Sequence, residues 1–167
     1  MKQRIIIVAL IMAVMSLSAW EINRQCEFPG NNYGIDVIGS HIWATGTGAI
    51  VAHSADSGAS FDFVETPAYS GDYPGLAAVA FGDAQHGIIV GEDGVAMLTA
   101  DGGTTWTINA DVAPLMGGNL INDAAYMADG HIIVASASGT IAISSDFGTT
   151  WAAATARHLT GTRSILL

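Results

Sequence analysis

One eight-residue turn occurs three times in this sequence at a constant spacing, and it constrains the fold more than any other feature. The second copy runs from Thr99 to Trp106 and the third from Ser144 to Trp151. A more diverged first copy runs from Ser54 to Phe61, and successive copies are 45 residues apart. Three copies at a fixed step predict a repeat architecture in which each repeat is one supersecondary unit.

Each copy follows the pattern S/T-x-D-x-G-x-T/S-W/F, and every fixed position has a physical role. The aspartate can accept hydrogen bonds from backbone N–H groups further along the turn, and the first hydroxyl joins the same local network. The glycine adopts a conformation that a Cβ would oppose, and the aromatic residue begins a strand and must be buried. These positions are Ser54, Asp56, Gly58, Ser60 and Phe61; Thr99, Asp101, Gly103, Thr105 and Trp106; and Ser144, Asp146, Gly148, Thr150 and Trp151.

The turn resembles the Asp-box, or bacterial neuraminidase repeat, which joins the third and fourth strands of β-propeller blades. The middle copy, with the segment from Phe81 to Gly94 before it, is most similar to the photosystem II stability/assembly factor type of repeat. The resemblance covers roughly residues 20–167. It implies an all-β fold, a partial β-propeller of about three four-stranded Asp-box blades, preceded by an N-terminal signal helix. In this family the box is a structural turn, so the resemblance implies no catalytic activity.

Alternating apolar residues and Gly or Asp at the joints predict blades at about 33–65, 76–109 and 120–154, connected by loops at 66–75 and 110–118. Segments 20–23 and 165–167 are expected to be strands of incomplete blades. A propeller closes at about four to eight blades. We therefore expect the front part of a longer, truncated propeller. A ring closed by several copies and an open three-blade arc are the alternatives.

The first 19 residues have the pattern of a secretory signal peptide. Lys2 and Arg4 precede an apolar run from Ile5 to Leu17, and small residues follow it at Ser18 and Ala19. This predicts an exported protein in a periplasmic, lumenal or extracellular location. The run is short for a membrane-spanning helix, and an uncleaved anchor is the alternative.

The charge of the chain excludes two classes of partner, and its single cysteine excludes an internal disulfide. Without residues 1–19 the chain would keep three arginines against fifteen carboxylates, a formal charge of −12. Such a surface repels nucleic acid and anionic lipid, so we expect no nucleic-acid partner and no membrane span after signal cleavage. Cys26 is the only cysteine, which excludes an internal disulfide.

No catalytic, metal or cofactor site is predicted. His41, His86 and His131 recur at one repeat position and suggest a zinc site. Equivalent positions on neighbouring blades, however, lie at equal radius around an axis, so the three rings are not expected to meet on one ion. The aspartates of the turns, one blade apart, do not form the pair of carboxylates that a glycosidase needs.

Sialidases share the Asp-box, and that resemblance implies three substrate-binding arginines, a tyrosine nucleophile and its glutamate. The mature chain has only Arg24, Arg157 and Arg163, and two of these follow the last box. We therefore predict that the chain is not an enzyme. The alternative is an N-terminal fragment of a carbohydrate-active propeller enzyme, a sialidase or glycoside hydrolase, whose catalytic residues lie beyond residue 167.

A binding site is expected at the end of the blades opposite the boxes, where the turns between second and third strands meet the blade-to-blade loops. The candidate residues there are Tyr69, Asp72, Tyr73, Glu92 and Asp93. The predicted function is a non-enzymatic, extracytoplasmic binding or assembly scaffold, similar to photosystem II assembly factor-like proteins. Its partner would be a protein or a glycan, and a homo-oligomer could close the propeller.

Overall fold

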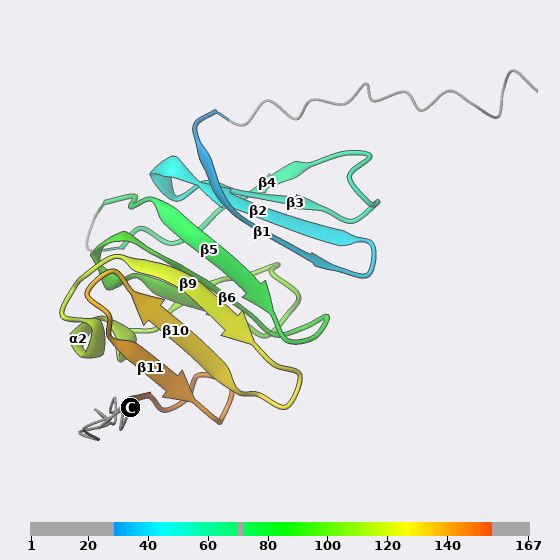
Figure 1. The fold of residues 1–167 in the computed structure, drawn as a ribbon. Helices are drawn as coiled ribbons and strands as arrows, with labels where there is room; N and C mark the ends of the chain where they lie inside the picture. Colours follow the sequence, from blue (N-terminus) through cyan, green and yellow to red (C-terminus); the bar gives the residue numbers. More distant parts are fainter. Residues whose placement is uncertain (1–28, 70–71, 155–167) are drawn as a thin grey trace, which may run out of the picture.

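The computed structural model describes residues 29–69 and 72–154, which form three four-stranded antiparallel sheets (Figure 1). The four strands of each sheet are consecutive in the chain, so each sheet is one propeller blade. Blade 1 contains β1 (Asn32–Ile38), β2 (His41–Gly46), β3 (Val51–Ser54) and β4 (Asp62–Val64). Blade 2 contains β5 (Leu76–Phe81), β6 (Gly87–Gly91), β7 (Ala96–Thr99) and β8 (Thr107–Ile108). Blade 3 contains β9 (Ile121–Tyr126), β10 (Ile132–Ser136), β11 (Ile141–Ser144) and β12 (Ala152–Ala153).

The blades stack in chain order through their first strands. β5 contacts β1 on one side and β9 on the other, which puts blade 2 in the middle (Figure 1). This arrangement is a partial β-propeller, and the predicted fold class is confirmed. The expected signal helix and the expected strands at 20–23 and 165–167 lie outside the described residues.

The core between blades 1 and 2 is built around Trp43 of β2. Its ring stacks on Phe81 of β5 with 5.1 Å between centroids and meets Trp106 edge-on at 6.0 Å. Trp106, the aromatic residue that ends the second repeated turn, is buried as predicted. Phe61 and Trp151, at the equivalent positions, are only partly buried, so the prediction of burial was wrong for those two copies. Offset-stacked and edge-to-face aromatic pairs stabilise such cores beyond the area that they bury.

The core between blades 2 and 3 is mainly aliphatic. Ile88 and Val90 of β6 pack with Tyr126 of β9 and with Ile132 and Val134 of β10. β6 is buried along its whole length because blade 2 has a neighbour on both faces. Its continuous apolar sequence is therefore that of a strand covered on two sides, and not of one that faces water.

The first blade departs from the 45-residue spacing in its first strand. The turn between β1 and β2 is one residue shorter than the corresponding turns in blades 2 and 3, since Ile38 pairs directly with His41. Val37 pairs with Ile42, and Phe81 pairs with Gly87. Val37 is therefore the structural equivalent of Phe81. Equivalent residues of β1 and β5 are separated by one residue less than the 45-residue spacing of the repeated turns.

The segment 110–118, expected to be a loop, contains the short helix α2 (Val112–Met116). The helix was not expected within this loop, and its apolar residues supply part of the core. Val112 and Met116 are one turn apart on one helix face, and both are buried against blades 2 and 3. Gly117 ends the helix in a left-handed conformation, φ 62°, and Gly118 donates from its N–H to the carbonyl of Ala113 at 3.1 Å.

Candidate binding face

The three repeated turns have one hydrogen-bonded geometry. Oδ1 of each aspartate accepts from the hydroxyl of the first residue at 2.8 Å in every copy. It also accepts from the N–H of Ser60, Thr105 or Thr150 at 2.8–2.9 Å. Oδ2 accepts from the hydroxyl of that same residue at 2.6–2.8 Å. Each carboxylate is therefore held inside its own turn, where it stabilises the joint between the third and fourth strands.

The first hydroxyl of each turn has a second role. In the three copies it accepts from the N–H of Gly58, Gly103 or Gly148 at 2.8–2.9 Å. These glycines have φ between +78° and +85°, a region that disfavours any other residue. The preceding position is also left-handed in each copy, although the first copy has Ser57 and the third has Phe147 there.

Hydrogen bonding keeps the aspartates ionised. The backbone N–H of Ser60, followed by its hydroxyl, lowers the pKa of Asp56 to about 2. The hydroxyls of Thr105 and Thr150 are the main cause of the lowered pKa values of Asp101 and Asp146. An acceptor-only carboxylate with such partners is stabilised in its charged form.

We expect the free energy of unfolding to decrease as the pH falls from 3.8 toward 2. The aspartate pKa values are lower in the folded than in the unfolded state, so the unfolded chain binds more protons in this range and acid favours it. Urea denaturation at a series of pH values measures the effect. Asp101→Asn should reduce the number of protons taken up on unfolding by up to one and flatten the profile. An unchanged profile in this variant would contradict the prediction.

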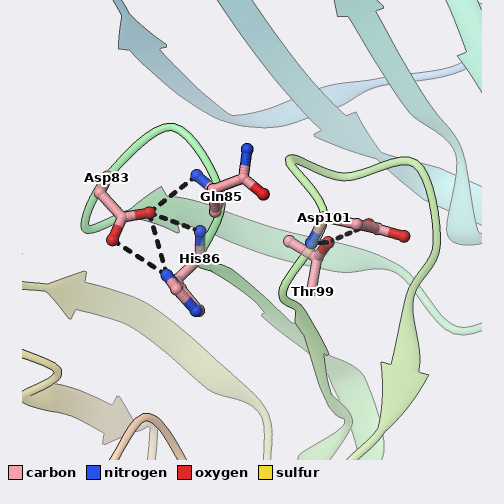
Figure 2. Close-up of polar contacts among 5 residues, drawn as sticks. All are labelled: Asp83, Gln85, His86, Thr99 and Asp101. Atoms are coloured by element: carbon pink, nitrogen blue, oxygen red, sulfur yellow. Dashed lines mark hydrogen bonds and ion pairs between the residues drawn. The ribbon is translucent and has the colours of Figure 1, made fainter.

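A second turn, built on Asp83, lies beside the repeated turn of blade 2 (Figure 2). Asp83 Oδ1 accepts from the N–H groups of Gln85 and His86, both at 2.7 Å, and His86 Nδ1 lies 2.9 Å from Asp83 Oδ2. The carbonyl of Gln85 accepts from the N–H of Gly102 at 2.8 Å. The His86 ring also contacts Phe147 of blade 3, with 4.8 Å between centroids. The turns at this end of blades 2 and 3 therefore contact one another directly.

The three repeat-equivalent histidines have separate partners. His41 Nδ1 lies 2.8 Å from Nε2 of His53, whose pKa is lowered by burial and by the charge of His41. His86 contacts Asp83, and His131 Nδ1 lies 3.0 Å from Asp129 Oδ1. Among residues 29–69 and 72–154, no group of three or more His, Cys, Asp or Glu side chains could hold a metal ion.

The opposite end of the blades, which we term the loop face, consists of the 3₁₀ turns η1 (Thr47–Ala49) and η2 (Glu92–Gly94), the described parts of the loop 66–75, and α2. Both turns hold the end of that loop. The carbonyl of Pro74 accepts from the N–H of Ala49 at 2.9 Å, and the carbonyl of Gly75 accepts from the N–H of Glu92 at 2.9 Å. Glu92 Oε2 in turn accepts from the N–H of Gly75 at 2.7 Å. These bonds join the end of the loop 66–75 to both 3₁₀ turns.

The five candidate residues all lie on the loop face, in different surroundings. Tyr69 and Asp72 exchange two backbone hydrogen bonds of 2.9 Å, and the Tyr69 side chain packs on the core between blades 1 and 2. Tyr73 is 59% exposed, which leaves its ring available to a partner. Asp93 is exposed, with a left-handed backbone at φ 56°.

Tyr73 and Glu92 line two separate hollows. Tyr73 borders a hollow of about 360 Å³ against β3 and β4, together with Glu65. Glu92 borders one of about 390 Å³ that also takes in the first strands of all three blades. The residues lining this second hollow are Tyr33, Gly75, Ala77, Glu92, Leu120 and Asn122.

Of the residues that line the second hollow, only Glu92 was predicted from the sequence, and Tyr33, Gly75, Ala77, Leu120 and Asn122 were not. Tyr33 and Asn122 lie on the first strands of blades 1 and 3, and Ala77 of blade 2 lies between them in the repeat order. The sequence signal that could have identified Tyr33 and Asn122 is this shared position in the repeat. The one-residue shift of β1 conceals it when the copies are aligned at a constant spacing.

Negative charge dominates the described part of the chain. Residues 29–69 and 72–154 contain thirteen aspartates and glutamates and no lysine or arginine. Over the same ranges, no helix is long and apolar enough to cross a membrane.

Solved structures share this fold. The structure described as YCF48 bound to D1 peptide matches with a TM-score of 0.68 and 22% sequence identity, over 78% of this chain and 42% of that chain. YCF48 from Cyanidioschyzon merolae matches with a TM-score of 0.67 and 19% identity over the same shares. This chain therefore spans less than half the length of the structures that it matches. No family model and no curated protein matches the sequence.

Proposed function

We propose that this chain is a non-enzymatic binding or assembly scaffold that takes a segment of a partner protein on its loop face, as photosystem II assembly factor-like proteins are expected to do. The observation that carries the proposal is the shared fold with a propeller whose structure was solved with a peptide bound. Two hollows and an exposed tyrosine on the loop face supply concave, partly apolar surface for such a segment.

The repeated turns are, in this proposal, structural Asp-boxes. Their carboxylates are occupied by hydrogen bonds within each turn, which supports a scaffold over a hydrolase. The apolar N-terminal run supports export, so the scaffold would act outside the cytoplasm.

The partner segment is expected to be cationic. The described part of the chain carries thirteen carboxylates without a lysine or arginine, and Glu92 and Asp93 are exposed on the loop face. Complementary charge raises the rate and specificity of association more than its final affinity. Binding should therefore weaken as ionic strength rises.

The test is fluorescence anisotropy with labelled peptides that share one apolar composition and carry net positive, zero or negative charge. We expect the positive set to bind, and Tyr73→Ala to weaken binding by about tenfold, as loss of an aromatic anchor does. Glu92→Gln keeps an oxygen for the Gly75 N–H and removes only the charge, so we expect a loss of about two- to fivefold.

Asp62→Asn is the matched control, because it removes an equal charge from the exposed start of β4, away from the loop face. It should bind peptide like the unchanged chain. Equal losses in Glu92→Gln and Asp62→Asn would reject the loop face as the site. Binding of a glycan panel without any peptide binding would reject the proposed function.

A further inference from the structure

Each blade interface joins two kinds of sheet face. The leading face of a blade packs on the next blade, and its trailing face packs on the previous one. Between blades 1 and 2, Trp43 on the leading face meets Phe81 on the trailing face. Between blades 2 and 3, Ile88 and Tyr126 occupy the equivalent positions and lie in one core cluster. The same pair of positions thus forms both interfaces within the chain.

The outer two faces carry this pattern without a described neighbour. By strand register, the leading face of blade 3 presents Ile133 where blade 2 has Ile88. The trailing face of blade 1 presents Val37 where blade 2 has Phe81. The two faces are therefore the two halves of the interface that the chain forms twice already.

The exposed fractions of the side chains show how much apolar surface these two faces present to solvent. Ile35 and Val37 of the trailing face are 70% and 58% exposed, whereas the equivalent Val79 and Phe81 are 6% and 8% exposed. On the leading face, Ile141 and Ile143 are 41% and 37% exposed, while the residue of blade 2 that matches Ile141, Ala96, is fully buried. Contiguous exposed apolar side chains of this kind mark an interaction surface.

We propose that the leading face of blade 3 docks on the trailing face of blade 1 of a second copy of this chain, and that two copies close a six-bladed ring. The contact is heterologous, because it joins two different faces, and such contacts form rings only when the rotation closes. Propellers close at about four to eight blades. Two copies of the three described blades fall within that range, and three copies exceed it.

The in-chain interfaces specify the new contacts. Ile133 of one copy takes the place of Trp43 and packs on Val37 of the other copy. Gly148 makes room for Leu98 of blade 2, and the equivalent Gly58 of the second copy makes room for Ile143. Since both copies are acidic, repulsion opposes the contact and added salt should strengthen it. The opposite salt dependence is expected for the peptide binding proposed above, so the two proposals can fail separately.

Light scattering after size exclusion chromatography of the purified full chain tests the proposal. We expect twice the chain mass, with the dimer fraction rising with salt. Ile35→Glu or Ile141→Glu places a charge in the contact and should raise the dimer dissociation constant at least about 100-fold. Ala68→Glu adds the same charge at an exposed site of the 66–75 loop and should leave the dimer intact.

Mixing the variants separates this interface from a symmetric one. A mixture of Ile35→Glu and Ile141→Glu chains retains one unaltered contact, so it should dimerise more strongly than either variant alone. In a Cys26→Ser background, Ile133→Cys and Val37→Cys chains should cross-link to each other when mixed, and neither should cross-link to itself.

Far-UV circular dichroism checks that each variant keeps its fold, which is expected for the glutamate variants because Ile35, Ile141 and Ala68 are exposed. A monomer at all concentrations and salt levels would overturn the proposal. So would a dimer that Ile141→Glu leaves unchanged, since a contact between two copies of the blade 1 face does not use that residue.

Discussion

Trp43→Ala is expected to destabilise the described fold by about 3–5 kcal/mol, the range for removing a large aromatic side chain from a core. Trp43 is fully buried between blades 1 and 2 and stacks on Phe81 and, at 3.8 Å between centroids, on His53. Its indole also fills the space beside Gly103 of the second repeated turn. Collapse of this cavity is restricted because both sheets are held by their own ladders.

Urea denaturation at neutral pH measures the loss. The matched control is Trp151→Ala in blade 3, where the tryptophan that ends the third turn is only partly buried and donates from Nε1 to the carbonyl of Gly148 at 3.0 Å. We expect a smaller loss there. Equal losses at the two sites would mean that the aromatic cluster around Trp43 is not a principal source of stability.

Gly103→Ala is expected to lower the free energy of unfolding by more than the backbone conformation of Gly103 alone explains. At φ +78° a Cβ costs about 1–2 kcal/mol. It would also clash with the Trp43 ring, which is stacked between His53 and Phe81. Gly139→Ala isolates the backbone cost, because Gly139 has φ +82° and no atom lies within 4 Å of the place that its new methyl group would take.

The double variant Trp43→Ala/Gly103→Ala completes the cycle. The cavity left by the indole admits the new methyl group. The double variant should therefore lose less free energy of unfolding than the sum of the two single variants, by about 0.5–3 kcal/mol. Additive losses, or a Gly103→Ala loss no larger than that of Gly139→Ala, would show that the close approach of turn and ring does not limit stability.

The fold was predictable because the repeated turn is specified by local chemistry. Asp101 and Thr99 find all their partners within the turn, so eight residues suffice to predict its geometry and its spacing predicts the blades. The helix α2 was not predictable in this way. Pro114 and two glycines in 110–118 are typical of a loop, and Val112 and Met116 become helical because burial against blades 2 and 3 outweighs weak local preference.

The candidate site was predictable only in outline. Strand order alone places Tyr73 and Glu92 at one end of the blades, but it does not reveal that they line different hollows. Tyr33 was missed because the short turn between β1 and β2 shifts its strand by one residue, and the side-chain period of two makes a one-residue shift decisive.

The order of strands within the sheets has a consequence for how the molecule assembles. Every ladder joins neighbours in sequence, so each blade can form from a short stretch of chain with little loss of loop entropy. The main contacts between the described blades join neighbouring repeats, as in a one-dimensional array of coupled units. Of the three described blades within one chain, only blade 2 has a neighbour on both faces. Folding of these residues is therefore expected to begin at blade 2 and to extend to blades 1 and 3.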